Sequence, residues 1–153
     1  MENVKVSTEI LHKEIDLIQA NITRMANNSF LLKGWFISLV IIALTLLLSQ
    51  GCSLELVGLF LFITTIEFWG LDAFFLKTET LYRWKYEWII EERLKGNTNY
   101  LYNLNPKLKL DRSENNDDCI FLFAVSKTLM ALYGVPLLIS IIIIGYCLIE
   151  TFA

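Results

Sequence analysis

The sequence predicts an all-α integral membrane protein with three transmembrane helices, an N-terminal amphipathic helix and a long second helix that extends into the cytoplasm. Three observations point to this class. Long apolar runs recur along the chain, 55% of its residues are hydrophobic with a mean hydropathy of +0.51, and all 13 Lys and Arg residues fall on one side of the predicted spans. Soluble domains are less apolar, so membrane spans explain this composition better.

The second apolar run belongs to one long helix over residues 54–95, a stretch without proline. Residues 54–76 are apolar except for Glu67 and Asp72. At a rise of ~1.5 Å per residue they reach roughly 34 Å, which is enough to cross a hydrocarbon core of about 30 Å. From Lys77 onward charges recur every few residues, so we expect the helix to leave the bilayer and continue along or beyond its surface.

Residues 1–29 precede the first span and carry a heptad pattern, which consists of Val4, Thr8, Leu11, Ile15, Ile18, Ile22, Met25 and Ser29. A seam of this kind predicts a cytoplasmic amphipathic helix that packs against a partner. The partner is either the helix over residues 82–94 of the same subunit or a second copy of the chain, and the pattern leaves both open. Asn27, Asn28 and Ser29 are expected to interrupt this helix before the membrane.

Residues 30–76 form a predicted transmembrane hairpin, because only a short turn at residues 50–53 separates the first two spans. An antiparallel hairpin with this turn places Lys33 at the depth of Asp72 and Ser38 at the depth of Glu67. We therefore predict an ion pair between Lys33 and Asp72 near the cytoplasmic boundary.

The rest of the chain divides into two parts. Residues 77–118 form a predicted cytoplasmic helix and loop, and residues 119–153 hold an interfacial segment followed by a third transmembrane helix. That third span is expected over about residues 129–149, with a kink at Pro136 because a proline inside a helix removes a hydrogen bond.

The basic residues also predict the orientation. They lie before the first span or between the second and the third, and neither the turn at residues 50–53 nor the C-terminal tail contains one. The positive-inside rule then places the N-terminus in the cytoplasm and the C-terminus outside.

Composition argues against several classes of function. His12 is the sole histidine, and the three cysteines are far apart in the sequence, so neither a catalytic set nor a metal site can be assembled from them. The basic residues form no stripe typical of nucleic-acid binding. We expect a protein that is not an enzyme, that holds no metal or cofactor and that binds no nucleic acid.

Glu67 is the residue whose position most needs an explanation, because a charge at the centre of a span costs about 2.5 to 3.5 kcal/mol on insertion scales. It either faces other subunits or a water-filled path, or it is a protonated acid bonded inside one subunit to Ser38, Thr64 or a backbone carbonyl. The sequence leaves both interpretations open.

Aromatic and basic residues alternate over residues 82–88. One interpretation is a membrane-interface belt in which the bases reach toward the headgroups. The other is a binding site for an anionic small molecule such as a nucleotide, formed by Arg24, Asn28, Tyr82, Arg83, Trp84 and Lys85.

Two strings carry a family resemblance, Arg24–Phe30 followed by Lys33-Gly34-Trp35, and Phe68–Asp72 leading to Thr80–Arg83. They resemble small bacterial membrane proteins of anti-phage defence, of the TIR-associated Thoeris type, and the hairpin with its cytoplasmic helix is similar to SLATT effectors. The third span departs from the SLATT pattern.

The resemblance implies an oligomeric inner-membrane effector of bacterial immunity, which perturbs or permeabilises the membrane when a nucleotide-type signal or a partner protein, such as a signal-producing enzyme, triggers it. The expected partners are then the lipid bilayer and further copies of the chain. The alternative is a non-enzymatic structural or regulatory subunit of a larger membrane complex.

Overall fold

The computed structural model describes residues 8–106 and 119–152, and within these ranges the regular elements are all helices. They are α1 (Thr8–Ser49), α2 (Leu54–Leu94), α4 (Ile120–Ala124) and α5 (Lys127–Phe152). Three of them, α1, α2 and α5, are long and apolar enough to cross a membrane. The all-helical class with three candidate spans is thus confirmed, whereas the part of the predicted loop over residues 107–118 lies outside the described residues.

The first helix is continuous, and the predicted interruption at Asn27, Asn28 and Ser29 is absent. α1 runs for 42 residues from Thr8 to Ser49. Asparagine is a weak helix former, but its effect is below about 1 kcal/mol per residue and packing against a neighbouring helix outweighs it. That packing continues across the asparagines, since Ile18, Ser29 and Phe36 are all buried on α1.

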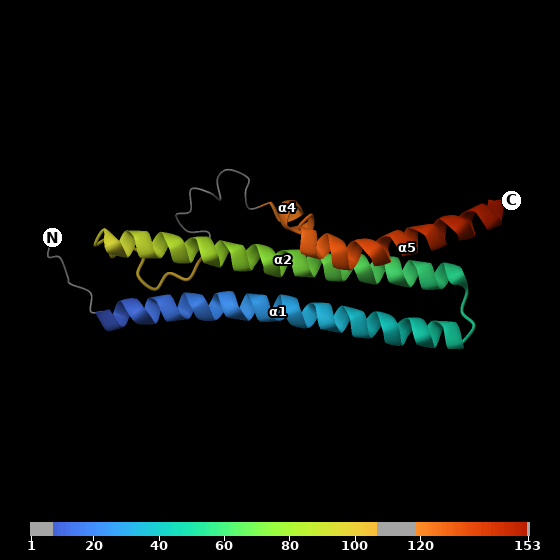
Figure 1. Ribbon diagram of the computed structural model, residues 1–153, viewed down its shortest axis with the longest axis horizontal. Helices are drawn as coiled ribbons and strands as arrows, with labels where there is room; N and C mark the ends of the chain where they lie inside the picture. The colour runs from blue at the N-terminus through green and yellow to red at the C-terminus, as the bar shows by residue number, and fades with distance from the viewer. Residues whose placement is uncertain (1–7, 107–118, 153) are drawn as a thin grey trace.

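The heptad seam of α1 faces α2 of the same subunit, which is the first of the two partners that the sequence left open. The buried residues of α1 recur at heptad-like spacing, and Leu81 and Ile89 are buried on the extramembrane part of α2. The two helices lie antiparallel over their full length, as Figure 1 shows. The two helices keep the same register along the hairpin, because Gln19 bonds Tyr86 and Lys33 bonds Asp72.

The turn between α1 and α2 is tight because Gly51 adopts a left-handed backbone with φ 64°. Glycine has no Cβ and takes this conformation without steric cost. Ser53 then caps α2, since its side chain accepts a hydrogen bond from the Leu56 backbone N–H at 3.4 Å. The predicted hairpin and its turn are confirmed.

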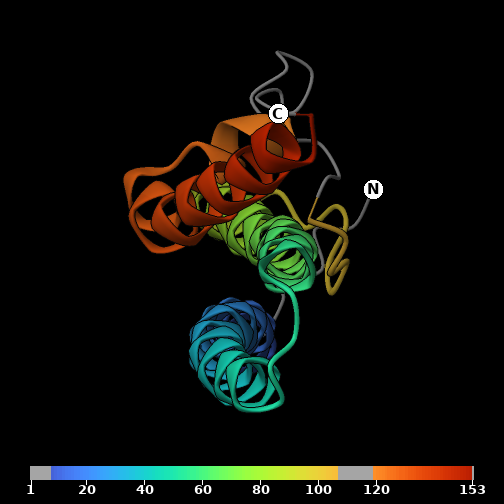
Figure 2. The ribbon, with the colours of Figure 1, turned by 90° about the vertical axis from the view of Figure 1, so that its right-hand side faces the viewer.

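α2 is the central helix, because it packs against α1, α4 and α5. Figure 2, viewed toward the end that holds the α1–α2 turn, shows α1 and α5 on different sides of α2. α5 runs antiparallel to α2, since Tyr133 bonds Asp72 near its start while Ile143 lies against Gly58 further along. The third span begins at Lys127 after a short break, and the helix continues through Pro136.

The part of α1 and α2 beyond the third helix forms a two-helix rod, which we define as residues 8–28 and 77–94 (Figure 1). The loop over residues 95–106 folds back along this rod. Within the described residues, every Lys and Arg lies on the rod, on its loop, at Lys33 or at Lys127, whereas the opposite end carries Glu55 and Glu150. The molecule therefore has one basic and one non-basic end.

The contact between α2 and α5 predicts the effect of enlarging Gly58. A Cβ added there would lie 2.8 Å from the Ile143 Cγ2 atom, whereas a Cβ at Gly34 on α1 would meet nothing within 4 Å. We expect Gly58→Ala to force the helices apart and to lower the free energy of unfolding by about 1–3 kcal/mol, as overpacking does. Gly34→Ala is the matched control and should not lower stability in a detergent-unfolding titration. Equal stability of the two variants would contradict this close approach.

Candidate functional site: buried charges of the helical hairpin

Asp72 is the polar centre of the three long helices. Its side chain is fully buried, and its carboxylate forms an ion pair with the Lys33 ammonium at 2.7 Å. The Ser29 hydroxyl donates to Asp72 Oδ1 at 2.5 Å, and the Tyr133 hydroxyl donates to Oδ2 at 3.1 Å. The predicted Lys33–Asp72 pair is confirmed, and we call the four residues the Asp72 cluster.

Each helix contributes to this cluster for a reason that can be traced to its sequence. Ser29 and Lys33 are one helical turn apart on α1, so both face the same side, and Lys33 Nζ also donates to Ser29 Oγ at 2.6 Å. Tyr133 lies six residues into α5. Because a buried carboxylate is costly unless it is paired and hydrogen-bonded, these contacts explain why Asp72 is tolerated inside the protein.

Aromatic rings shield one side of the cluster. The Phe36 ring lies 4.9 Å from the Tyr133 ring and 5.5 Å from the Phe68 ring, and the Trp69 ring stacks on Tyr133 at 6.2 Å. The Trp69 Nε1–H donates to the Ala124 carbonyl at 2.9 Å and thereby attaches α4 to α2. Excluding water strengthens the ion pair, since electrostatic interactions grow in a medium of low dielectric.

Glu67 lies on the opposite, exposed surface of α2. It is surrounded along the helix by apolar side chains that are about half exposed, and with them it forms what we call the Glu67 stripe: Leu56, Leu59, Ile63, Ile66, Glu67, Gly70, Leu71 and Phe74. Within the described part of the chain, no hydrogen bond or ion pair connects Glu67 with Ser38 or Thr64. Ser38 is itself exposed and Thr64 is buried. The interpretation of Glu67 as an acid bonded inside one subunit therefore has no contact to support it.

The structure separates the residues predicted to form an anion-binding site. Lys85 is fully buried between the helices, whereas Arg83 is exposed and bonds Glu79 on its own helix at 2.6 Å. Arg24 is exposed and donates to Asn21. Asn28 lines a shallow hollow of about 300 Å³ together with Leu31, Leu32, Trp35 and Phe75. Tyr82 and Trp84 are half-buried. These six residues do not line either of the two hollows described here together, and the anion-binding site stays a prediction.

A different groove runs along the rod and retains one of these residues. It has a volume of about 470 Å³ and is lined by Gln19, Ile22, Thr23, Arg83, Tyr86 and Glu87. The Gln19 side-chain amide donates to the Tyr86 hydroxyl at 3.3 Å across it. The groove carries one cation and one carboxylate, so its charge is balanced and it is not specialised for an anion.

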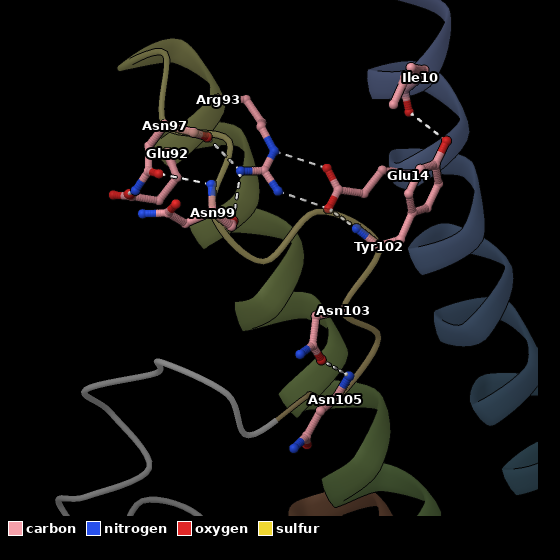
Figure 3. A network of polar contacts seen from close by, with 9 residues as sticks. All are labelled: Ile10, Glu14, Glu92, Arg93, Asn97, Asn99, Tyr102, Asn103 and Asn105. Atoms are coloured by element: carbon pink, nitrogen blue, oxygen red, sulfur yellow. Dashed lines mark hydrogen bonds and ion pairs between the residues drawn. The ribbon is translucent and has the colours of Figure 1, made fainter. Parts of the chain in front are cut away.

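A second buried charge network closes the far end of the rod (Figure 3). Glu14 is 1% exposed and binds the Arg93 guanidinium through two hydrogen bonds of 2.9 Å each. The Tyr102 backbone N–H donates to Glu14 Oε1 at 3.0 Å, and the Tyr102 hydroxyl donates to the Ile10 carbonyl at 3.2 Å. α1, α2 and the loop over residues 95–106 therefore meet at one carboxylate.

Lys85 adds a second cation next to this network. It is fully buried and lies 4.5 Å from the centre of the Trp88 ring. Burial lowers the pKa of the Lys85 ammonium below its ordinary value of 10.5, while the nearby Glu14 carboxylate opposes this shift. The Glu14 carboxylate thus acts on two cations, because it pairs with Arg93 and its negative charge favours the charged form of Lys85.

Sequence reasoning missed Ser29, Tyr133, Glu14 and Arg93 as partners of buried charges. Ser29 was the one polar member of the C-terminal part of the heptad, which was a usable signal for an inward hydroxyl. Glu14 flanks the seam next to Ile15, and nothing in the sequence distinguishes it from a solvated acid. Among the described residues, no group of three or more His, Cys, Asp or Glu side chains is placed to hold a metal ion.

Comparisons with protein-family models, with curated proteins and with solved structures found no match to this chain.

The Asp72 cluster predicts strong coupling between Lys33 and Asp72. Lys33→Met leaves the buried Asp72 carboxylate without its counter-charge and should lower the free energy of unfolding by about 3–5 kcal/mol. Asp72→Leu should cost less, because the Lys33 side chain is 27% exposed and its ammonium can reach solvent. The double variant should cost clearly less than the sum of the two, as measured in a double-mutant cycle by detergent unfolding. Additive costs would show that the two side chains act independently.

The rod predicts unequal roles for its buried charges. Glu14→Gln removes the carboxylate that pairs with Arg93 and that favours the charged form of Lys85, and it should destabilise the rod by about 3–5 kcal/mol. Lys85→Met leaves a balanced Glu14–Arg93 pair and should cost less than Glu14→Gln. Thermal unfolding monitored by circular dichroism compares the stability of the two variants. A larger loss of stability in Lys85→Met than in Glu14→Gln would contradict the central role of Glu14.

Proposed function

We propose that the chain is an oligomeric effector of the bacterial inner membrane, whose copies assemble through the Glu67 stripe and perturb or permeabilise the bilayer. The supporting observation is the position of Glu67, which lies on the exposed face of a helix able to cross a membrane and has no bonded partner among the described residues. An isolated carboxyl facing lipid is costly, whereas a neighbouring copy or a water-filled path lowers that cost.

The shape of the stripe supports close association between helices. Gly70 lies one turn from Glu67 and has open space around it, so a second helix can approach the backbone there. Small residues favour helix–helix contact in membranes because they allow close packing and interhelical hydrogen bonds. In an assembly of this kind the Glu67 carboxyls face one another or line a central path.

The proposed orientation places the rod and the N-terminus in the cytoplasm and the C-terminus outside. It is supported by the restriction of basic residues to one end of the described structure. The role in bacterial immunity, and triggering by a nucleotide-type signal or a partner protein, rest on the resemblance to anti-phage membrane effectors.

The alternative is a structural or regulatory subunit of a larger membrane complex. The rod favours it to some extent, because two long helices project beyond the third span and offer an extended surface to a partner (Figure 1). Copurification with an enzyme in the absence of any depolarisation would favour this alternative.

The effector proposal predicts that Glu67→Gln abolishes or strongly reduces membrane depolarisation while the oligomer still forms. Glutamine keeps the size and hydrogen bonding of the side chain but removes its charge. Expression in cells carrying a potential-sensitive dye, with crosslinking of membranes to measure assembly, gives both readouts. Glu55→Gln is the matched control, because Glu55 is an exposed acid near the turn end of the same helix. Unchanged depolarisation in Glu67→Gln would show that the mechanism does not use the charge of Glu67.

A further inference from the structure

The rod is held closed at its far end by contacts that converge on one carboxylate. Arg93 from α2 and the Tyr102 backbone from the loop both bind Glu14, and Arg93 also donates to the carbonyls of Asn97 and Asn99. Figure 3 shows these groups converging between the helices. Removing Glu14 from this position would break all of its contacts at once, because they share the same two oxygens.

The loop that completes this junction has a strained backbone. Tyr100 and Tyr102 adopt left-handed conformations with φ 60° and 58°. Residues with a Cβ rarely take this conformation, and they persist in it only where surrounding contacts compensate. The strain therefore opposes the closed arrangement and is offset by the bonds to Glu14 and to the Ile10 carbonyl.

The other end of the rod contains a point at which α1 is intrinsically weak. Asn27 and Asn28 are consecutive, and both have lower helix propensity than the residues of a typical helix interior. They lie where the rod meets the Asp72 cluster, one or two residues before Ser29. Packing against α2 holds α1 straight in the closed rod, so these asparagines become the weakest point of α1 only when the packing of the segment before them is released.

We propose that Glu14, Arg93 and Tyr102 form a latch, and that its release lets the N-terminal segment of α1 exchange onto a second copy of the chain. Opening exposes Ile18, Leu81 and Ile89, which are at most 3% exposed in the closed rod. A second copy offers the same apolar seam and the same Glu14–Arg93 complementarity, so the exchanged rod recovers the contacts that opening breaks. The exchange uses the rod and not the Glu67 stripe, and it does not depend on the proposed function.

Reciprocal charge reversal tests the latch within one chain. Glu14→Arg places two guanidiniums together, and Arg93→Glu places two carboxylates together, so each single variant should open the rod. The double variant restores opposite charges and should close it. A cysteine introduced at Ile18, in a chain whose native cysteines are replaced by serine, reports opening through its rate of reaction with a maleimide in native membranes. We expect at least about a tenfold increase in each single variant and recovery in the double variant.

Mixing the two single variants tests the exchange. A chain with Glu14→Arg and a chain with Arg93→Glu are each repulsive alone, but an exchanged pair contains only opposite charges. Two differently tagged chains expressed together should therefore copurify, and their Ile18 cysteines should become protected. The matched control pairs Glu79→Arg with Arg83→Glu, because this ion pair is exposed and lies within one helix.

Each outcome decides the proposal. Copurification specific to the Glu14 and Arg93 variants supports exchange. Failure of these chains to protect one another, while the double variant is closed, would overturn exchange and leave only an intramolecular latch. Reactive cysteines in the double variant would overturn the latch itself. Because both variants retain Glu67, loss of depolarisation in Glu67→Gln would be an independent result.

Discussion

The arrangement of the three long helices depends on a single buried carboxylate. Asp72 is fully buried on the central helix and has to be neutralised and hydrogen-bonded where it lies. Lys33 supplies the charge, Ser29 and Tyr133 supply hydrogen bonds, and these groups come from α1 and α5. The contacts of Asp72 therefore stabilise the register that the short turn gives the hairpin, and they join the third helix to it at Tyr133.

The same principle operates at the far end of the rod with different consequences. Glu14 is also fully buried, but it is bound by a loop with two left-handed tyrosines and lies close to two cations. The Asp72 cluster is enclosed by aromatic rings inside the bundle, whereas the Glu14 network lies at the end of a two-helix rod. Three helices surround the Asp72 pair, whereas two helices and a loop hold the Glu14 pair, and that loop is part of the proposed latch.

Glu67 contrasts with both of these acids. It lies only a few residues from Asp72 on the same helix, yet it is exposed among apolar side chains. The helical repeat explains the difference, because a separation of five residues rotates a side chain by roughly 140° and directs it away from α1. An acid that no partner among the described residues neutralises is the strongest reason to consider contacts between subunits.

The sequence by itself determined the helical class, the three long apolar helices, the tight hairpin and the pairing of Lys33 with Asp72. These features follow from the periodicity and length of the apolar runs and from the geometry of a short turn. Each depends only on neighbouring residues or on position along the helix axis. The continuity of α1 through its two asparagines, the burial of Glu14 with Arg93 and the dispersal of the predicted anion-binding residues were decided only by the tertiary structure. Those features depend on how far each helix is rotated about its own axis and on which loop folds back over it, and the free energy of these choices comes from contacts between residues far apart in the sequence.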